Sequence, residues 1–238
     1  MRFVLLLTLA ATLLHAQSFE VASVKVNTSG TGMSSFPGLR NGHLKSSNAT
    51  MRQILQVAWG LSSVQITGPS WLDSDRYDLD AKAPDGVPDT ELKPMLQALL
   101  KERFNLQAHP ETKELPVYDL VVLKGGPKIQ PADPGRPFTQ PARLPGACCM
   151  MVNVKGTMDQ LATALAGPAG RPVIDKTGLD GAYVYVLQYA QLGTAVDPDS
   201  APDIFGAVQQ QLGLKLESDK APVPVLVVES ANRVPSGN

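Results

Sequence analysis

The chain is poor in the residues that most often carry enzyme chemistry. Its 238 residues include two cysteines, three histidines and 5% aromatic residues. The two cysteines are adjacent, so the Cys-x-x-Cys spacing of thioredoxin-like sites and zinc knuckles is missing. The His-Glu-x-x-His and Gly-x-Ser-x-Gly patterns are missing as well. We therefore expect no metal site and no cofactor, and the sequence names no catalytic residue.

The chain also lacks an excess of one charge and a long apolar run beyond its N-terminus. Lysine and arginine number 21 against 22 aspartates and glutamates, which gives a net charge of −1. This composition excludes the basic surface that nucleic-acid binding requires. No later run approaches the roughly 20 apolar residues of a membrane-spanning helix, so we expect no membrane span in the mature chain.

The first 16 residues have the layout of a secretory signal peptide. A basic residue, Arg2, precedes an apolar run over residues 3–14, and Ala16 supplies a small residue before the expected cleavage point. The run is too short for a membrane anchor. We expect an exported protein, periplasmic or extracellular, whose mature chain begins at Gln17.

A helix start occurs twice in nearly the same form. Thr50-Met51-Arg52-Gln53 returns 107 positions later as Thr157-Met158-Asp159-Gln160. A Thr followed three residues later by Gln has the spacing of a capping box, in which each side chain binds the other residue's backbone N–H. Apolar residues at i, i+3, i+4 and i+7 follow each start, which predicts two short amphipathic helices ending near Gly60 and Gly167.

The segments that follow each helix start also correspond, with offsets of 106 to 108 positions. The matched pairs are Val64–Ile66 with Pro172–Ile174, Leu72-Asp73 with Leu179-Asp180, Tyr77–Leu79 with Tyr183–Tyr185, Phe104–Leu106 with Leu212–Leu214, and Leu120–Val122 with Leu226–Val228. Offsets that vary by only two positions indicate an internal duplication. Two copies are too few for a solenoid, so two packed halves are the better interpretation.

The expected fold is α+β, with two similar halves that each pack two helices on a mostly antiparallel sheet. The predicted divisions are a signal peptide at 1–16, a first half at 17–124, a Pro/Gly-rich linker at 125–147 and a second half at 148–238. Each half is predicted to end in a β-hairpin. The first hairpin would turn at Glu111–Glu114, and the second would pair Leu214–Glu217 with Val223–Glu229.

The most site-like residues are Trp71 and Asp73, within the turn that joins two predicted strands. A Trp beside Gly-Pro can line a binding groove, although Trp71 can equally cover the edge of the core. Asp73 lies near Asp75, and a hydrolase that uses both carboxylates is the alternative function. That alternative requires the two to converge in a cleft with at least one raised pKa. Asp73 also corresponds to Asp180, which favours a role in shaping a turn.

The adjacent Cys148 and Cys149 cannot form an ordinary disulfide with each other, because their Cα atoms are too close. Two free thiols are the favoured interpretation, while a strained bridge or a redox-dependent dimer stays open. His43 and His109 have no partner at a catalytic spacing, which favours structural or solvated roles.

Several segments in order give the chain a resemblance to a known group. They are Phe19–Lys25, Asn48–Gln53, Gly68–Asp78, Leu99–Phe104, Glu114–Tyr118, Asp175–Leu179 and Leu212–Glu217. The chain resembles the soil-associated secreted protein family, abundant in acidobacteria, which is built on a domain of unknown function. The resemblance implies export and this domain, and it carries over no catalytic residue. Related domains attached to metallopeptidase-like membrane sensors imply sensing or binding.

A weaker similarity links the Thr-Met-Arg-Gln helix start to the short N-terminal domains of secretins and TonB-dependent receptors, which bind partner proteins. The function expected from all these observations is a non-enzymatic binding or interaction module of the cell envelope. Its partner would be an envelope protein or a glycan, and its oligomeric state is left open.

Overall fold

The computed structural model describes residues 18–30, 35, 38–133, 135, 138–191, 193 and 200–237. The predicted signal peptide lies outside these residues. Within them the protein is α+β, with four α-helices and three sheets. No helix in this part of the chain is long and apolar enough to cross a membrane.

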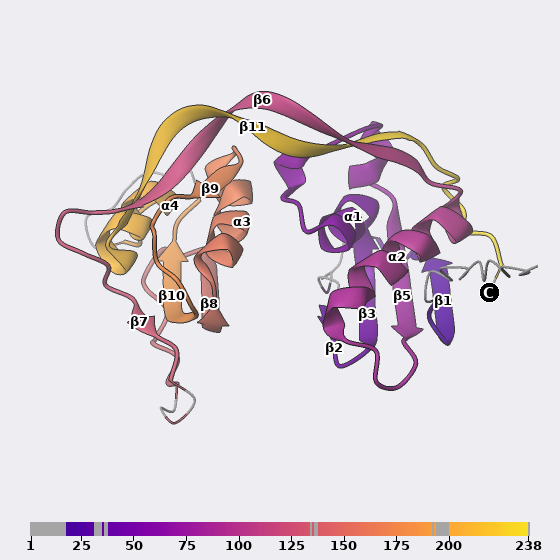
Figure 1. Ribbon diagram of the computed structural model, residues 1–238, viewed down its shortest axis with the longest axis horizontal. Coiled ribbons are helices and arrows are strands. Elements are labelled where there is room, and N and C mark those ends of the chain that lie inside the picture. The colour runs from indigo at the N-terminus through magenta and orange to yellow at the C-terminus, as the bar shows by residue number, and fades with distance from the viewer. Residues whose placement is uncertain are drawn as a thin grey trace, which may run out of the picture.

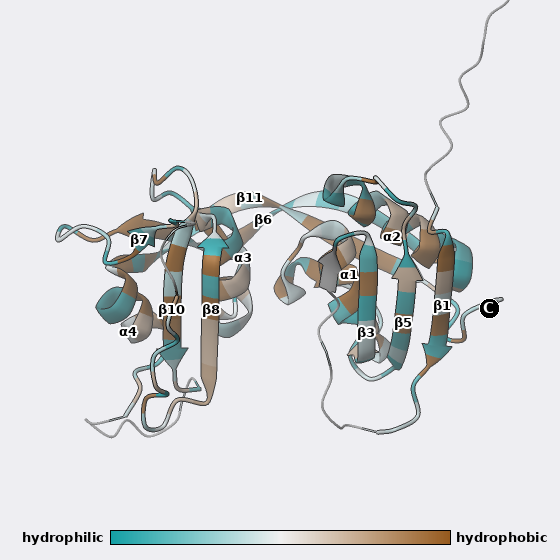
Figure 2. Cartoon of the chain, turned by 90° about the horizontal axis from the view of Figure 1, so that it is seen from below, coloured by the Kyte–Doolittle hydropathy of each residue, from teal (hydrophilic) through white to brown (hydrophobic). Residues whose placement is uncertain are grey.

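The molecule has two lobes joined by one long two-stranded ribbon, which arches over both of them (Figure 1). Seen from the side opposite the ribbon, the two lobes' sheets lie in front and α1, α2 and α3 lie behind them (Figure 2). In the first lobe α1 and α2, and in the second lobe α3, therefore lie between the sheet and the ribbon. In each lobe, apolar residues of the sheet, the helices and the ribbon share one core.

The first lobe contains an antiparallel sheet with strand order β1-β5-β3-β2. The strands are β1 (Val21–Val26), β2 (Gly38–Arg40), β3 (His43–Thr50) and β5 (Arg76–Lys82). Helices α1 (Met51–Trp59) and α2 (Asp89–Phe104) pack on it. Fully buried Tyr77 and Phe104 meet edge to face in this core, with ring centroids 5.0 Å apart.

The second lobe contains a smaller sheet with strand order β7-β10-β8. Its strands are β7 (Gln130–Pro131), β8 (Cys149–Gly156) and β10 (Tyr183–Tyr189), and helices α3 (Met158–Ala169) and α4 (Ile204–Ala207) pack against it. The last helix continues from α4 as a π-helical turn, Val208–Leu212. β7 lies within the predicted linker and pairs with β10.

The ribbon corrects the prediction of two hairpins. β6 (Gln107–Val122) and β11 (Leu214–Ser230) are each one continuous strand, and they pair with each other along almost their whole length. The expected turn at Glu111–Glu114 is the middle of β6, where Glu114 lies opposite Pro222. The prediction was wrong because Glu-Thr-Lys-Glu contains no residue suited to the positive φ of a tight turn.

The ribbon is extended at each end by a short strand from the opposite half of the chain. β4 (Ile66–Thr67) runs parallel to β11, with Ile66 opposite Leu226. β9 (Val173–Asp175) runs parallel to β6, with Ile174 opposite Asp119. The ribbon is therefore joined by backbone hydrogen bonds to both lobes, which fixes their positions relative to it.

Four prolines lie within the ribbon and none of them costs a ladder hydrogen bond. The N–H of Tyr118 donates to Pro172 on β9, so even-numbered residues of β6 direct their backbone groups away from β11. The carbonyl of Pro224 accepts from the side chain of Gln65, so even-numbered residues of β11 point outwards too. Pro110, Pro116, Pro222 and Pro224 all have this parity. Their ring nitrogens stand on the open edges, where a further strand would otherwise pair.

The two predicted capping boxes are confirmed. Thr50 and Gln53 exchange side chain–backbone hydrogen bonds at the start of α1, as do Thr157 and Gln160 at the start of α3. α1 ends at Gly60 as predicted. α3 runs past Gly167 and ends at Gly170, which has φ of 74°. The predicted helix was about one turn too short. Gly167 keeps helical geometry, and the left-handed residue that ends the helix is Gly170.

Candidate binding cleft

A cleft of about 660 Å³ lies between the two lobes, with α1 on one side and α3 on the other. Most of its lining is uncharged and half of it is apolar or glycine. The first lobe contributes Gln56, Val57, Gly60, Leu61, Ser62 and Lys93, and the second contributes Asp159, Gln160, Thr163, Ala164, Gly167 and Pro168. This volume and lining are typical of a site for a small ligand or a few residues of a peptide.

The wall from the first lobe is formed by the C-terminal end of α1. Gly60 closes the helix in the left-handed conformation, with φ of 65°, and Gln56 accepts hydrogen bonds from the N–H groups of Gly60 and Leu61. A Cβ atom at position 60 would lie 2.8 Å from Nζ of Lys93. Glycine therefore serves twice here, by adopting the positive φ and by leaving room for the lysine side chain over the helix end.

The wall from the second lobe is the exposed face of α3. Met158, Leu161 and Leu165 point into the core, whereas Asp159, Thr163 and Gly167 on the other side of the helix line the cleft. Thr163 turns its hydroxyl back to the carbonyl of Asp159, at 2.9 Å. Pro168 lacks an N–H, so it cannot supply the usual helical donor to the carbonyl of Ala164. The cleft is therefore lined by a helix that presents small side chains and a weakened hydrogen-bond ladder.

The ribbon and η1 (Ser63–Gln65) hold the two walls together. Nε2 of Gln65 donates to the carbonyl of Pro224 at 2.9 Å, and Oε1 of Gln65 accepts from the buried Ser62 hydroxyl at 2.7 Å. A small apolar cluster of Val117, Val223 and Val225, packed with Ile174, seals the ribbon against β9. The cleft is thus built on buried contacts rather than on loops, which favours a stable shape.

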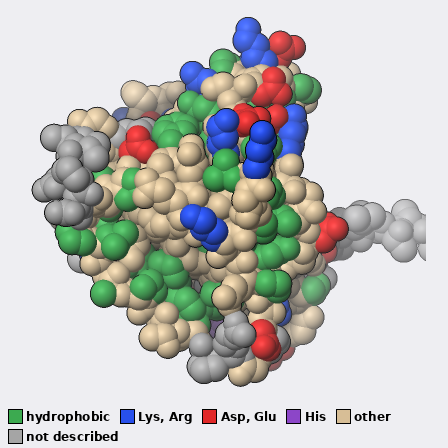
Figure 3. Space-filling model, turned by 90° about the vertical axis from the view of Figure 1, so that its left-hand side faces the viewer, with side chains coloured by type: hydrophobic (Ala, Val, Ile, Leu, Met, Phe, Trp, Pro, Cys, Tyr) green, Lys and Arg blue, Asp and Glu red, His purple; other side chains and the backbone are tan. Residues whose placement is uncertain are grey.

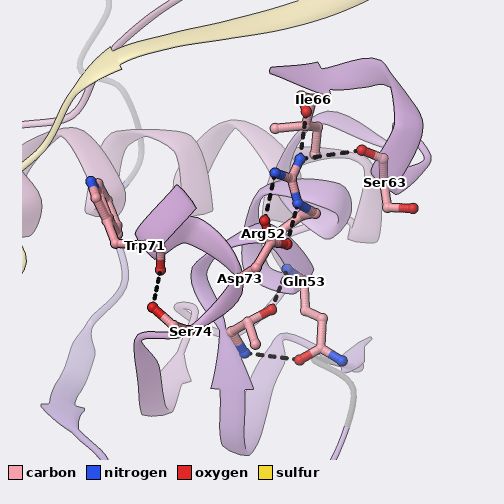
Figure 4. Close-up of polar contacts among 8 residues, drawn as sticks. Arg52, Gln53, Ser63, Ile66, Trp71, Asp73 and Ser74 are labelled. Atoms are coloured by element: carbon pink, nitrogen blue, oxygen red, sulfur yellow. Dashed lines mark hydrogen bonds and ion pairs between the residues drawn. The ribbon is translucent and has the colours of Figure 1, made fainter. Parts of the chain in front are cut away.

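The predicted site residue Asp73 does not line this cleft. It lies at the end of η2 (Ser70–Asp73) and forms a two-point ion pair with Arg52 of α1. Nε of Arg52 is 2.5 Å from Oδ1, and Nη2 is 2.9 Å from Oδ2 (Figure 4). Nη1 of Arg52 also donates to the carbonyls of Ser63 and Ile66. The hydrogen bond from Arg52 lowers the pKa of Asp73, and the network fastens α1 to the chain on both sides of β4.

Asp75 is occupied by a different arginine. Nε of Arg233 lies 2.5 Å from Oδ2 of Asp75 and Nη2 lies 2.7 Å from Oδ1, which binds the C-terminal segment to β5. The hydrogen bond from Arg233 lowers the pKa of Asp75. Beside it, the hydroxyl of Tyr77 donates to the carbonyl of Arg233, and burial raises the pKa of Tyr77 to about 12.

The two carboxylates therefore do not meet the geometric condition of the hydrolase alternative. Each is saturated by its own guanidinium, and each has a lowered rather than a raised pKa. A carboxylate that acts as general acid or base would need a pKa nearer to neutral. Both groups are better explained as structural ion pairs.

Trp71 is partly buried and packs against the core of the first lobe, away from the cleft. Its carbonyl accepts from the hydroxyl of Ser74 (Figure 4). This placement fits the interpretation that Trp71 covers the edge of the core. No sequence motif identified these residues as the lining of a cleft. They come together only because α1 and α3 face each other from the two lobes.

His43 and His109 lie outside the cleft. His109, on β6, contacts Glu111 at 2.9 Å through Nε2 and Glu229 at 3.1 Å through Nδ1. The hydrogen bond from His109 contributes most to the lowered pKa of Glu111. His43 is exposed at the start of β3.

Charged side chains gather towards the ribbon, at the top of Figure 3, while the surface of the second lobe below the ribbon carries few charged side chains.

The fold and the cleft together define a two-lobed α+β protein whose lobes are joined by a shared ribbon. Within that class, the chain belongs to the family described as a protein of unknown function (DUF3738), whose model matches residues 52–231. Neither a curated protein nor a solved structure matches the chain. The predicted resemblance to a family built on a domain of unknown function is confirmed for that domain, while the soil association stays a prediction.

Proposed function

We propose that this protein is a non-enzymatic binding module of the cell envelope and that its ligand occupies the cleft between α1 and α3. The observation that carries the proposal is the cleft itself, which lies between the two lobes and is lined by residues of both. Ligand sites occur preferentially at such interfaces between structural units. Its described lining contains one lysine and one aspartate, and neither has a catalytic partner in contact.

The lining favours a short peptide segment of an envelope protein over a glycan. Val57, Leu61 and Pro168 offer apolar surface for a side chain, and Gln56 and Thr163 offer groups that bind backbone amides. None of the lining residues is aromatic, although sugar rings commonly stack on aromatic faces. Lys93 and Asp159 contribute opposite charges from opposite lobes, which would orient a polar chain between them.

The test compares two lysines of the same helix. Immobilised protein, residues 17–238, would be used to pull down binding partners from the organism's own envelope fraction. The variants Lys93→Ala and Lys101→Ala would be tested in parallel. Both lysines are exposed on α2, but only Lys93 lines the cleft. We expect Lys93→Ala and a cleft-filling Ala164→Trp to lose the retained protein while Lys101→Ala keeps it. Equal retention by all variants would remove the cleft from the proposal, and retention of glycan alone would change the ligand class.

Export and internal duplication are part of the same proposal. The export signal rests on the sequence of residues 1–16. The duplication is supported by the matching capping boxes of α1 and α3 and by the crosswise pairing of β4 with β11 and of β9 with β6. A cleft between two related halves would follow directly from their association about a shared ribbon.

A further inference from the structure

Cys148 and Cys149 lie side by side at the start of β8, and both thiols are free. Successive side chains in a strand point to opposite faces, but Cys148 precedes the strand and is not bound by that alternation. Its Sγ lies 3.6 Å from the carbonyl oxygen of Tyr189, the residue that pairs with Cys149 across the ladder. Both sulfurs are therefore gathered against one residue of β10.

The neighbouring Cys148 thiol is the largest cause of the raised pKa of Cys149, and burial of the Cys149 thiol is the next. Cys149 is half-buried against the core of the second lobe, whereas Cys148 is exposed to solvent. Cys149 thus anchors the pair to the core, while the exposure of Cys148 leaves the site accessible to a ligand.

Arg143 provides a positive charge beside the pair. Its Nη1 donates to the carbonyls of Ala147 and Cys148, both at 3.3 Å. This arrangement fixes the backbone turn that leads into β8 and places a guanidinium where it favours electron-rich sulfur. The described residues offer no third thiol or histidine in a metal-ligand grouping with this pair, so a four-coordinate zinc site does not fit.

We propose that Cys148 and Cys149 together form a binding site for a trivalent, thiol-seeking metalloid such as As(III) or Sb(III). Soft sulfur ligands select soft acceptors. A pyramidal trivalent centre holds two sulfurs at close to a right angle, which suits the side chains of two adjacent residues. A linear two-coordinate metal ion would need them on opposite sides of the metal.

The binding step is a condensation without a change of oxidation state. With phenylarsine oxide, two S–H bonds and the As=O bond are broken and two As–S bonds are formed. The two thiol protons leave with the oxygen as one molecule of water. With arsenite, two hydroxyl groups leave as two molecules of water, and the third remains on arsenic. No oxidant or reductant takes part.

Phenylarsine oxide is the probe for the test, applied to reduced residues 17–238 and followed by mass spectrometry. We expect one adduct per chain, removed by a dithiol competitor and resistant to a monothiol at the same concentration. Cys148→Ser and Cys149→Ser should each weaken binding roughly 100-fold or more, because two linked thiols act at a high effective concentration. Met151→Leu, on the same strand, should leave binding unchanged and serves as the matched control.

Two results would overturn the proposal. One is equal retention of the adduct by either single-cysteine variant, which would show that each thiol reacts alone. The other is displacement of the adduct from the wild type by the monothiol as readily as by the dithiol. Circular dichroism of each serine variant would establish that it is folded, so that a loss of binding reports on the thiols.

Discussion

Gln65 of the first lobe donates a hydrogen bond from its side chain to the backbone carbonyl of Pro224 in the ribbon, at 2.9 Å. The two residues are 159 positions apart, yet this contact decides how η1 meets β11 beside the cleft. Pro224 presents this carbonyl because its backbone groups point away from β6. The cleft therefore depends on contacts between segments that are distant in the sequence.

Arg52 should matter more to stability than its partner Asp73. The guanidinium binds the carboxylate at two points and two backbone carbonyls as well, whereas the carboxylate is exposed over 58% of its side chain. We expect Arg52→Ala to lower the free energy of unfolding by about 2–3 kcal/mol. Asp73→Ala should cost about 1 kcal/mol. Urea unfolding measures both, and an equal cost for the two variants would contradict the asymmetry.

Acid should weaken the anchoring of the C-terminal segment through Asp75. Its folded pKa is lowered below the usual value. The stability it contributes is therefore present above the unfolded pKa and is lost as the pH falls through the folded pKa. We expect the wild type to lose more stability between pH 7 and pH 3 than the Arg233→Ala variant does. Identical pH profiles in urea unfolding would show that the ion pair contributes nothing.

The four ribbon prolines should act chiefly against association. Replacing Pro116 and Pro222 by valine restores N–H groups on the open edges without removing any internal hydrogen bond. We expect little change in the stability of the monomer and a marked increase in aggregation, measured by light scattering. Pro127→Val, in the predicted linker, is the control for adding a valine. A double variant that stays monomeric at high concentration would refute this role.

The N-terminal caps of α1 and α3 should contribute similar amounts to stability. Thr50→Ala and Thr157→Ala each remove a hydroxyl that accepts from the backbone N–H of a Gln three residues later. We expect each change to lower the free energy of unfolding by about 1 kcal/mol. The double-alanine variant should show an additive loss, because the two caps lie in different lobes. Serine at either position should restore most of it.

The features that the sequence predicted are local ones. The capping boxes, the end of α1 at Gly60 and the free cysteines all depend on residues within a few positions of one another. These interactions involve only neighbouring residues, so a pattern of residue types is enough to predict them.

The pairing of β6 with β11 could not be predicted from local patterns. The residue pattern of each strand fits a hairpin folded at the strand's own middle, and that pairing closes a much shorter loop than the pairing of β6 with β11. Tertiary structure decided otherwise, because the strands gain more by covering both lobes and joining β4 and β9. The arginine partners of Asp73 and Asp75 could not be predicted either, because these contacts are also long-range. Arg233, for example, lies 158 positions from Asp75.

The sequence by itself determined where helices begin, which residues are apolar and which chemistry is scarce. Only the tertiary structure decided that α1 and α3 face each other, that the ribbon unites the lobes and that the two candidate carboxylates form separate ion pairs. The division follows from distance along the chain. Short-range hydrogen bonds and hydrophobic periodicity depend on neighbouring residues. A cleft exists only where segments far apart in the sequence pack together.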